Sequence, residues 1–225
     1  MTTQRTADGP GRLTIDVLTT DPAHPVNASL ERWAAEQAPR HDVRILRRRS
    51  ELQRGDLLFL VSCLEIIPQE DRERYTHCLV LHGSDLPEGR GMSPIVWQVL
   101  EGRRALTLTL LEAEDEVDSG RVWRKEPIAL TGYELYDEIN ALVFEAETKL
   151  MTWAVGNVST VRPRPQEGTP TVYPRRRPAD SQLDPDATIR EQFDLLRVSD
   201  PDRYPAFMEL DGHRFTVRLE RSDPS

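Results

Sequence analysis

The chain has 225 residues, enough to bury one sizeable hydrophobic core and a small appendage. Hydrophobic residues make up 38% and charged residues 30%, which excludes a chain disordered throughout, and no apolar run reaches the roughly 20 residues that a membrane span requires. The net charge of -9 disfavours a polyanion such as a nucleic acid as the main partner.

The first half of the chain predicts strands that alternate with short helices. Met1 to Arg12 is polar and lacks the apolar stretch of a signal peptide, which favours a cytoplasmic protein. Between the first two strands, Asn27 or Ser29 is expected to cap a helix over 30–37. Alternating or unbroken apolar residues predict strands over 13–18, 42–46, 56–62 and 78–82.

The next segment continues this alternation. Ser93 is expected to cap a helix that has Pro94 at its first position and ends at Gly102. A strand over 105–111 and a strand pair over about 121–130 follow. Strands alternating with helices at this spacing predict an α/β fold, with a doubly wound sheet that is parallel or mixed.

The longest predicted helix follows these strands. Thr131 and Glu134 have the spacing of a capping box, which predicts that this helix starts there. Apolar residues then recur every three or four positions, as on the buried face of a helix. This expected core stripe is Leu135, Ile139, Leu142, Ala146, Leu150 and Trp153.

Composition divides the chain into three parts. Residues 13–155 hold the alternating strands and helices and form the predicted main domain. Residues 156–185 are rich in proline and arginine, which is typical of a linker or a draped loop. Residues 186–221 predict a small extension, with a helix over 187–197 and a hairpin whose strands, 207–210 and 213–219, flank a type I′ turn at Asp211-Gly212.

The candidate catalytic residues follow two of the predicted strands. His82 ends an apolar strand and is followed at once by turn-forming residues, the usual position of functional groups in open α/β sheets. Asp118 comes after the 105–111 strand and is its natural carboxylate partner for acid–base chemistry. The residues alone leave a second interpretation open, in which His82 bonds a loop carbonyl and Asp118 closes a turn before Gly120.

Other reactive residues have simpler interpretations. Cys63 and Cys78 lie in apolar runs and are predicted to be small hydrophobic side chains, and no metal-ligand spacing is present in the sequence. The basic run 44–49 is interpreted as a solvated strand end. A second run, 175–177, lies in the proline-rich segment beside Tyr173 and is either a charged loop or a phosphate contact.

A longer motif surrounds the histidine. It reads His-Gly-Ser-Asp-Leu-Pro-Glu-Gly-Arg-Gly-Met-Ser-Pro over 82–94 and is followed by Trp97-Gln98, Gly102 and Asp118-Ser119-Gly120. This pattern resembles the formyltransferase superfamily, and most closely the amino-sugar N-formyltransferases of pseudaminic-acid-type pathways. The similarity covers most of the chain from about residue 13, and its central motif is the most specific part.

The resemblance implies a fold, a donor and roles for several residues. It implies a Rossmann-like formyltransferase catalytic domain over 13–155 and N10-formyltetrahydrofolate as the formyl donor, with tetrahydrofolate as product. It implies that His82 is the catalytic base and Asp118 its partner. The residues that it places near the folate are Gly89, Arg90, Gly91, Glu112, Ala113, Glu114 and Val117.

One position departs from the family pattern. The superfamily has a catalytic asparagine two residues before the histidine, and the present chain has Val80 there. Valine cannot donate a hydrogen bond to a developing oxyanion, and the loss of one such donor typically costs about 10²–10³-fold in rate. Ser84, a backbone N–H of the glycine-rich loop, or doubly protonated His82 could take its place.

The expected acceptor is a nucleotide-linked amino sugar, which needs contacts to a base and a diphosphate. An aromatic ring to stack on and guanidinium groups have suitable chemistry. The candidates are Trp97, Tyr173, Arg175, Arg177, Tyr204 and Asn27, with core packing, a charged loop and helix capping as the simpler interpretations. The alternatives are a formyltransferase for another small amine, a hydrolase of the donor, and a folate-binding protein without catalysis. We expect no nucleic-acid or membrane partner and no metal, and a homodimer is compatible with the sequence.

Overall fold

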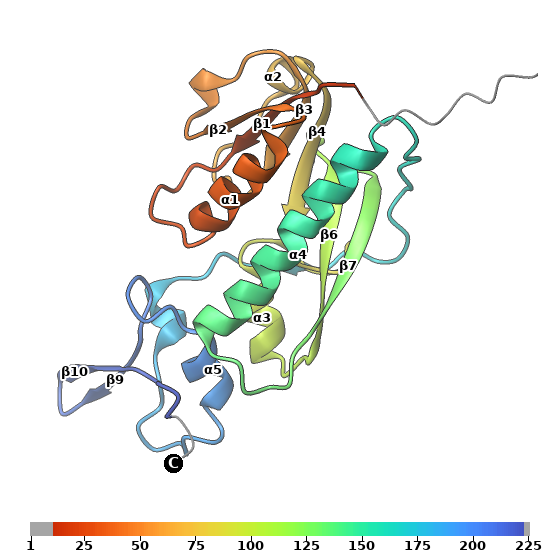
Figure 1. Cartoon of the computed structure of the whole chain (residues 1–225). Helices are drawn as coiled ribbons and strands as arrows, with labels where there is room; N and C mark the ends of the chain where they lie inside the picture. The colour runs from red at the N-terminus through yellow and green to blue at the C-terminus, as the bar shows by residue number, and fades with distance from the viewer. Residues whose placement is uncertain (1–10, 223–225) are drawn as a thin grey trace, which may run out of the picture.

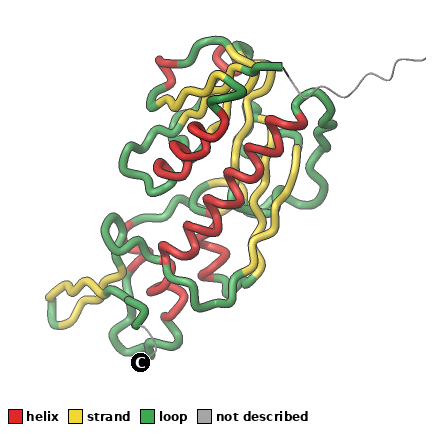
Figure 2. Tube along the Cα trace, in the orientation of Figure 1, coloured by secondary structure: helices red, strands yellow, loops and turns green. Residues whose placement is uncertain are grey.

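The computed structural model describes residues 11–222, so most of the polar start, Met1 to Arg12, lies outside the described residues. Figures 1 and 2 show a sheet flanked by helices, with the C-terminal part at one end. The helices are α1 (Asn27–Gln37), α2 (Gln69–Arg72), α3 (Pro94–Leu100), α4 (Tyr136–Asn157) and α5 (Phe193–Val198). The strands are β1 (Thr14–Leu18), β2 (Asp42–Leu46), β3 (Gly55–Leu60), β4 (Tyr75–His82), β5 (Arg90–Gly91), β6 (Ala105–Glu112), β7 (Val122–Ala129), β8 (Val172–Tyr173), β9 (Ala206–Leu210) and β10 (His213–Val217).

Six strands form one mixed sheet in the order β2-β1-β3-β4-β6-β7. β1 is parallel to β2 and β3, and β3 is parallel to β4, whereas β6 is antiparallel to both of its neighbours. The predicted α/β fold with a parallel or mixed sheet is confirmed. The predicted strand pair over 121–130 is wrong, because β7 pairs with β6 as one strand along its whole length.

The sheet separates two hydrophobic cores. Helices α1 and α4 lie in front of it in Figure 1 and cover one face, where Trp33 of α1 packs edge-on against Phe59 of β3. On the opposite face, Leu58 packs with Leu52 and Ile67 from the segments that connect the strands. Because alternate residues of β3 are buried in the two cores, this strand appears in the sequence as an unbroken apolar run.

The longest helix starts later than predicted. Glu134 accepts hydrogen bonds from the backbone N and the hydroxyl of Thr131, both at 2.6 Å, but these bonds close a turn ahead of the helix. α4 begins at Tyr136. The residue before it, Leu135, donates a hydrogen bond from its backbone N to the side chain of Glu138 at 2.8 Å. The predicted stripe is buried at Ile139, Ala146 and Leu150, whereas Leu135, Leu142 and Trp153 are half-buried.

Three shorter helices also differ from their predicted ends. α1 begins at Asn27, three residues before the predicted start. Ser93 has a left-handed backbone with a φ of 53° and makes no capping hydrogen bond, although Pro94 does begin α3. α5 covers only 193–198, because Thr188 and Glu191 bond to each other in a separate turn.

The proline- and arginine-rich segment returns along the body of the protein. The backbone of Arg164 pairs with Val122 of β7 at 2.7 and 2.9 Å, and β8 pairs with β5. These contacts favour a draped loop over a free linker. Beyond it, β9 and β10 form the predicted hairpin, and Asp211 and Gly212 both have positive φ, as a type I′ turn requires.

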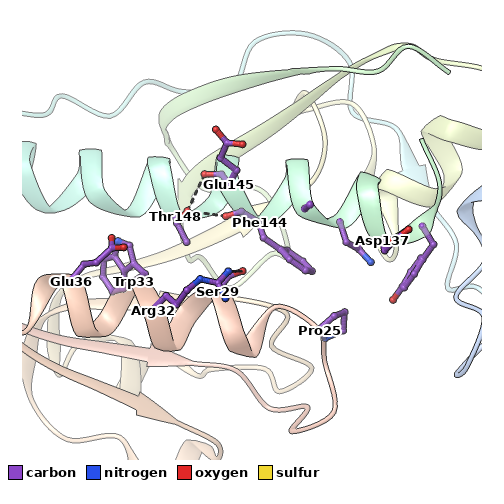
Figure 3. A pocket seen from close by; sticks show the side chains of 12 residues that line it. Pro25, Ser29, Arg32, Trp33, Glu36, Asp137, Phe144, Glu145 and Thr148 are labelled. Atoms are coloured by element: carbon purple, nitrogen blue, oxygen red, sulfur yellow. Dashed lines mark hydrogen bonds between the residues drawn. The ribbon is translucent and has the colours of Figure 1, made fainter. Parts of the chain in front are cut away.

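A groove of about 440 Å³ lies between α1 and α4 (Figure 3). Trp33 and Phe144 contribute apolar surface to it, and Arg32 and Glu36 contribute charge. The residues that line it include none of the site residues predicted from the sequence. The groove is therefore separate from the candidate site.

Glu147 is a carboxylate buried among the apolar residues of α4. Its Oε2 has no hydrogen-bond partner among the described residues, and burial raises its pKa to about 8. The folded state therefore binds the proton more tightly than the unfolded state, where the ordinary pKa of the carboxyl group is 4.5. Stability is thus highest below the unfolded pKa and falls as the pH rises from about 4.5 to 8, by up to about 1.4 kcal/mol per pH unit.

We expect Glu147→Met to remove this loss, since methionine has a similar shape and no charge. Chemical denaturation at pH 5 and pH 8 measures the effect: the variant gains stability over wild type at pH 8 and much less at pH 5. Glu145→Met, at an exposed position of the same helix, is the control and should shift both values little. An equal gain at both pH values would show that Glu147 is not the titrating group.

Candidate active site

The predicted catalytic histidine lies at the carboxyl end of β4. Along this strand His82 follows Cys78 and Val80 on the side of the second core. The register of β6 places Thr109 beside His82, and the hydroxyl of Thr109 donates to the backbone carbonyl of Ser84 at 2.6 Å. This bond fixes the start of the loop that follows β4.

His82 and Asp118 form a buried pair. Nδ1 of His82 lies 3.4 Å from Oδ1 of Asp118, and the side chains are 8% and 7% exposed. Nε2 of His82 lies 2.8 Å from the carbonyl oxygen of Gly89 and must carry a hydrogen, because a carbonyl only accepts. Nδ1, which faces Asp118, therefore carries the lone pair when the ring is neutral and a hydrogen when the ring is charged. The sequence left open a catalytic pair or a loop contact, and the structure contains both contacts.

Asp118 lies in a tight turn after β6. Its φ of 56° is left-handed, a conformation that costs free energy unless the surroundings hold it. Oδ2 of Asp118 accepts a hydrogen bond from the backbone N of Gly91 at 2.8 Å. A Cβ on Gly120 would lie 1.8 Å from the carbonyl oxygen of Glu112, so the Asp-Ser-Gly turn requires its glycine.

The loop between β4 and β5 is held by its own polar groups and by the draped segment. The hydroxyl of Ser84, which is 1% exposed, donates to the carbonyl of Glu88 at 2.6 Å. The backbone N of Gly89 donates to the hydroxyl of Thr171 at 2.8 Å. Ser84 thus shapes the loop that presents a carbonyl to the histidine, and its catalytic role stays a prediction.

Arg90 joins this loop to its neighbours. Its guanidinium pairs with Glu116 at 2.7 Å and donates to Oε1 of Gln166 at 3.1 Å. Its Nε is buried and has no partner among residues 11–222. A ligand acceptor at this edge of the site would therefore find an available donor.

The loop after β6 has apolar and acidic residues. Ala113 and Val80 both pack against the second core, so the position of the family's asparagine presents only methyl groups. Val117 is 59% exposed. Glu112 and Glu114 lie against the Asp-Ser-Gly turn. This loop begins beside Cys78 of β4 and folds back so that Asp118 meets His82, and the folate contacts of its residues stay a prediction.

An aromatic pair lies next to the histidine's loop. The rings of Trp97 and Tyr173 are stacked, with centroids 6.4 Å apart and planes 16° from parallel, and the guanidinium of Arg176 lies 5.7 Å from the Trp97 ring. A Cβ on Gly89 would lie 2.7 Å from the Tyr173 ring. Burial and a 2.8 Å hydrogen bond to Glu101 raise the pKa of the Tyr173 hydroxyl to about 12, so it stays neutral.

The remaining predicted acceptor residues are more scattered. Arg175 and Arg177 are exposed, and Tyr204 is 55% exposed. Asn27 is buried, and its Oδ1 accepts a bond from Arg47 at 2.5 Å while its Nδ2 donates to two carbonyls of the loop before α1. The asparagine therefore braces that loop, and its contact with an acceptor stays a prediction.

Two residues at the site have no signal in the sequence. Gln166 and Thr171 belong to the proline-rich segment, and both reach the loops around His82 and Asp118. Only the interpretation of this segment as a draped loop points toward such contacts. Nothing in their residue types or spacing distinguishes them from solvated loop residues.

Residues 11–222 contain neither a metal-binding cluster nor a membrane-spanning helix. In that range, no group of three or more His, Cys, Asp and Glu side chains could hold a metal ion. Both cysteines are free, Cys78 buried and Cys63 half-buried. No helix of the described part is long and apolar enough to cross a membrane.

Several curated sequence relatives of this chain are methionyl-tRNA formyltransferases. The methionyl-tRNA formyltransferase of Thermodesulfovibrio yellowstonii is 24% identical over 149 residues, which is 65% of this chain and 48% of that protein. Related enzymes from other bacteria match in the same way. The chain spans about half the length of the curated relatives it matches.

Solved structures confirm the fold. Methionyl-tRNA formyltransferase from Clostridium thermocellum superposes with a TM-score of 0.80 at 23% identity, covering 94% of each chain. A 4-N formyltransferase from Francisella tularensis gives 0.72 at 16% identity, covering 96% of this chain and all of the other. HypX from Aquifex aeolicus, in complex with tetrahydrofolic acid, gives 0.77 at 20% identity over 92% of this chain and 38% of that one.

The family follows from a direct match to the sequence. The formyl transferase model matches residues 17–155, which include the end of β1, the strands β2 to β7, both members of the His82–Asp118 pair and most of α4. The match covers more than half of the chain and agrees with the fold and with the histidine motif. The chain therefore belongs to the formyl transferase family.

Proposed function

We propose that the chain transfers a formyl group from N10-formyltetrahydrofolate to the primary amine of a nucleotide-linked amino sugar. The main support is that the Trp97–Tyr173 pair packs against Gly89, whose carbonyl oxygen is hydrogen-bonded to His82. Aromatic rings beside the loop of His82 support the stacking of a nucleotide base there. The exposed guanidinium groups of Arg175 and Arg177 follow in the same segment and suit a diphosphate.

Arg90 and the loop after β6 fit the proposed donor. Arg90 has a buried Nε without a partner among the described residues, which suits an acceptor atom on the ligand. The loop after β6 offers apolar side chains such as Val117, together with backbone groups, to a flat heterocycle. When bound, the donor supplies the formyl group that the amine attacks.

His82 and Asp118 supply the acid–base chemistry. Because Nε2 of His82 donates to a carbonyl, Nδ1 is the atom that takes the proton from the attacking amine. Asp118, 3.4 Å away, then stabilises the positive charge on the ring and fixes its orientation. Both side chains are nearly buried, which strengthens this interaction relative to one in water.

Methionyl-tRNA is the second candidate acceptor, because the sequence relatives carry that name. One observation disfavours it: the net charge of -9 opposes the binding of a polyanion. A different small amine, or donor binding without transfer, remains the alternative to be tested, the latter because Val80 replaces the family's asparagine.

Mass spectrometry of a reaction panel tests the proposal. The purified chain is incubated with N10-formyltetrahydrofolate and nucleotide-linked 3-amino and 4-amino sugars, with a hydroxyornithine-like amine, with methionyl-tRNA, or with no acceptor. We expect one amino sugar to gain a formyl group in a time-dependent reaction. A formylated tRNA or another amine instead would overturn the amino-sugar assignment.

Two controls separate the other outcomes. Formate released without an acceptor would identify a hydrolase of the donor. Donor binding measured by calorimetry, without product from any acceptor, would identify a non-catalytic binding protein. His82→Ala in the same panel shows whether a product depends on this site.

A further inference from the structure

Gln166 lies in the draped segment, outside the motif that identifies the site. It follows Arg164, whose backbone pairs with Val122 at the start of β7. Its side chain is half-buried and reaches the turn that carries Asp118. Gln166 and Asp118 are 48 positions apart in the sequence, so no local sequence pattern predicts this contact.

The carboxamide of Gln166 uses all of its polar groups here. Nε2 donates to the carbonyl oxygens of Asp118 and Gly120 at 2.8 and 2.9 Å. Oε1 accepts a bond from Arg90 at 3.1 Å. The two carbonyls can only accept and the guanidinium can only donate, so the partners themselves fix the orientation of the amide.

These bonds hold a strained turn. Asp118 has a left-handed φ of 56°, which requires fixation by its surroundings. Pinning the carbonyls on both sides of Ser119 sets the direction of the Asp118 side chain, and with it the 3.4 Å approach to His82. The bond to Arg90 ties the same amide to the loop whose Gly91 N–H binds the other carboxylate oxygen.

We propose that Gln166 is a positioning residue that sets the geometry of the Asp118–His82 pair for formyl transfer. The proposal rests on the proposed function, in which this pair moves the proton. Gln166 acts through Asp118 and is not in contact with His82. Its loss allows the Asp118 turn to relax, so the carboxylate no longer faces Nδ1 at the distance that stabilises the protonated ring.

Two variants separate the contacts of Gln166. Gln166→Met keeps the length of the side chain and removes all three hydrogen bonds. Gln166→Glu keeps an acceptor for Arg90 and removes both donors to the turn. Two lost hydrogen bonds predict that kcat falls by about 10-fold to 100-fold in both variants. The KM for the donor rises only in Gln166→Met, where Arg90 also loses one of its two side-chain partners and keeps only Glu116. Gln53→Met, at an exposed glutamine, is the control and keeps wild-type kinetics.

A second readout does not depend on turnover. Nuclear magnetic resonance of histidine rings labelled with 15N reports the environment of His82, whose signal is assigned by its absence in His82→Ala. We expect this signal to shift in both Gln166 variants and to stay in place in Gln53→Met. The pH profile of kcat is expected to change in the Gln166 variants as well.

The outcomes distinguish this proposal from the proposed function. An unshifted His82 signal with wild-type kcat in a folded Gln166→Met would overturn the positioning role. If wild type transfers no formyl group, the proposed function fails, and the ring signals alone then decide: a shift supports positioning of the pair and no shift overturns it. If Gln166→Met does not fold, Gln166→Glu provides the same two tests.

Discussion

His82→Ala is expected to reduce kcat of formyl transfer by about 10²-fold to 10⁴-fold, the usual contribution of a positioned acid or base. The ring lies between Asp118 and the carbonyl of Gly89, and its Nδ1 lone pair is the proposed proton acceptor. Alanine removes this acceptor and leaves intact Val117 and Arg90, which are proposed to contact the donor. Donor affinity, measured by calorimetry, should therefore change little.

A matched histidine provides the control for this variant. His213 lies exposed at the start of β10, and His213→Ala is expected to keep wild-type kinetics. The far-ultraviolet circular dichroism of both variants checks that the fold is retained. Wild-type turnover in folded His82→Ala would remove this residue from the mechanism. A loss of both turnover and donor binding would show that its role is structural.

Asp118→Asn is expected to lower kcat almost as much, with little change in stability. The amide oxygen of asparagine can keep the bond to the N–H of Gly91, which turns its NH₂ group toward Nδ1 of His82. That group donates to the lone pair that would take the proton, and the negative charge is lost. We therefore expect a decrease of about 10²-fold to 10⁴-fold, as when a triad carboxylate becomes an amide.

Asp211→Asn is a matched control, because Asp211 is also a left-handed aspartate in a turn. Asparagine tolerates this conformation well, so both variants should fold with unchanged melting temperatures. Steady-state kinetics measures kcat of both variants, and only Asp118→Asn is expected to lose activity. Unchanged kcat in Asp118→Asn would leave this residue as a turn former only.

The sequence predicted most of the elements because buried strands leave a strong local pattern. The strand over 42–46 matches β2 residue for residue, and the hairpin turn at Asp211-Gly212 has its predicted conformation. Strand direction leaves no such pattern, so the antiparallel course of β6 and the unbroken course of β7 appear only in the structure. The start of α4 was misplaced because Thr131 and Glu134 form a real capping contact in a turn outside the helix.

The candidate site was predictable to the extent that its residues belong to one motif. His82 and Asp118 stand out because each follows a strand, and the structure places them 3.4 Å apart. The environment of Ser84 and Asn27 was not predictable, because both side chains are occupied by backbone carbonyls of loops whose shape no local pattern specifies. Gln166 and Thr171 were missed because a chain segment must return across the sheet before they meet their partners.

The draped segment changes what counts as a minimal catalytic unit. The family match ends at residue 155, yet the side chains that brace both loops of the candidate site, Gln166 and Thr171, lie beyond that boundary, as does Tyr173. A fragment cut at the end of the match would keep the histidine motif and lose its supports. Transplanting this active site into another protein would thus require the chain through at least Tyr173, even though the recognisable motif ends some fifty residues earlier at Gly120.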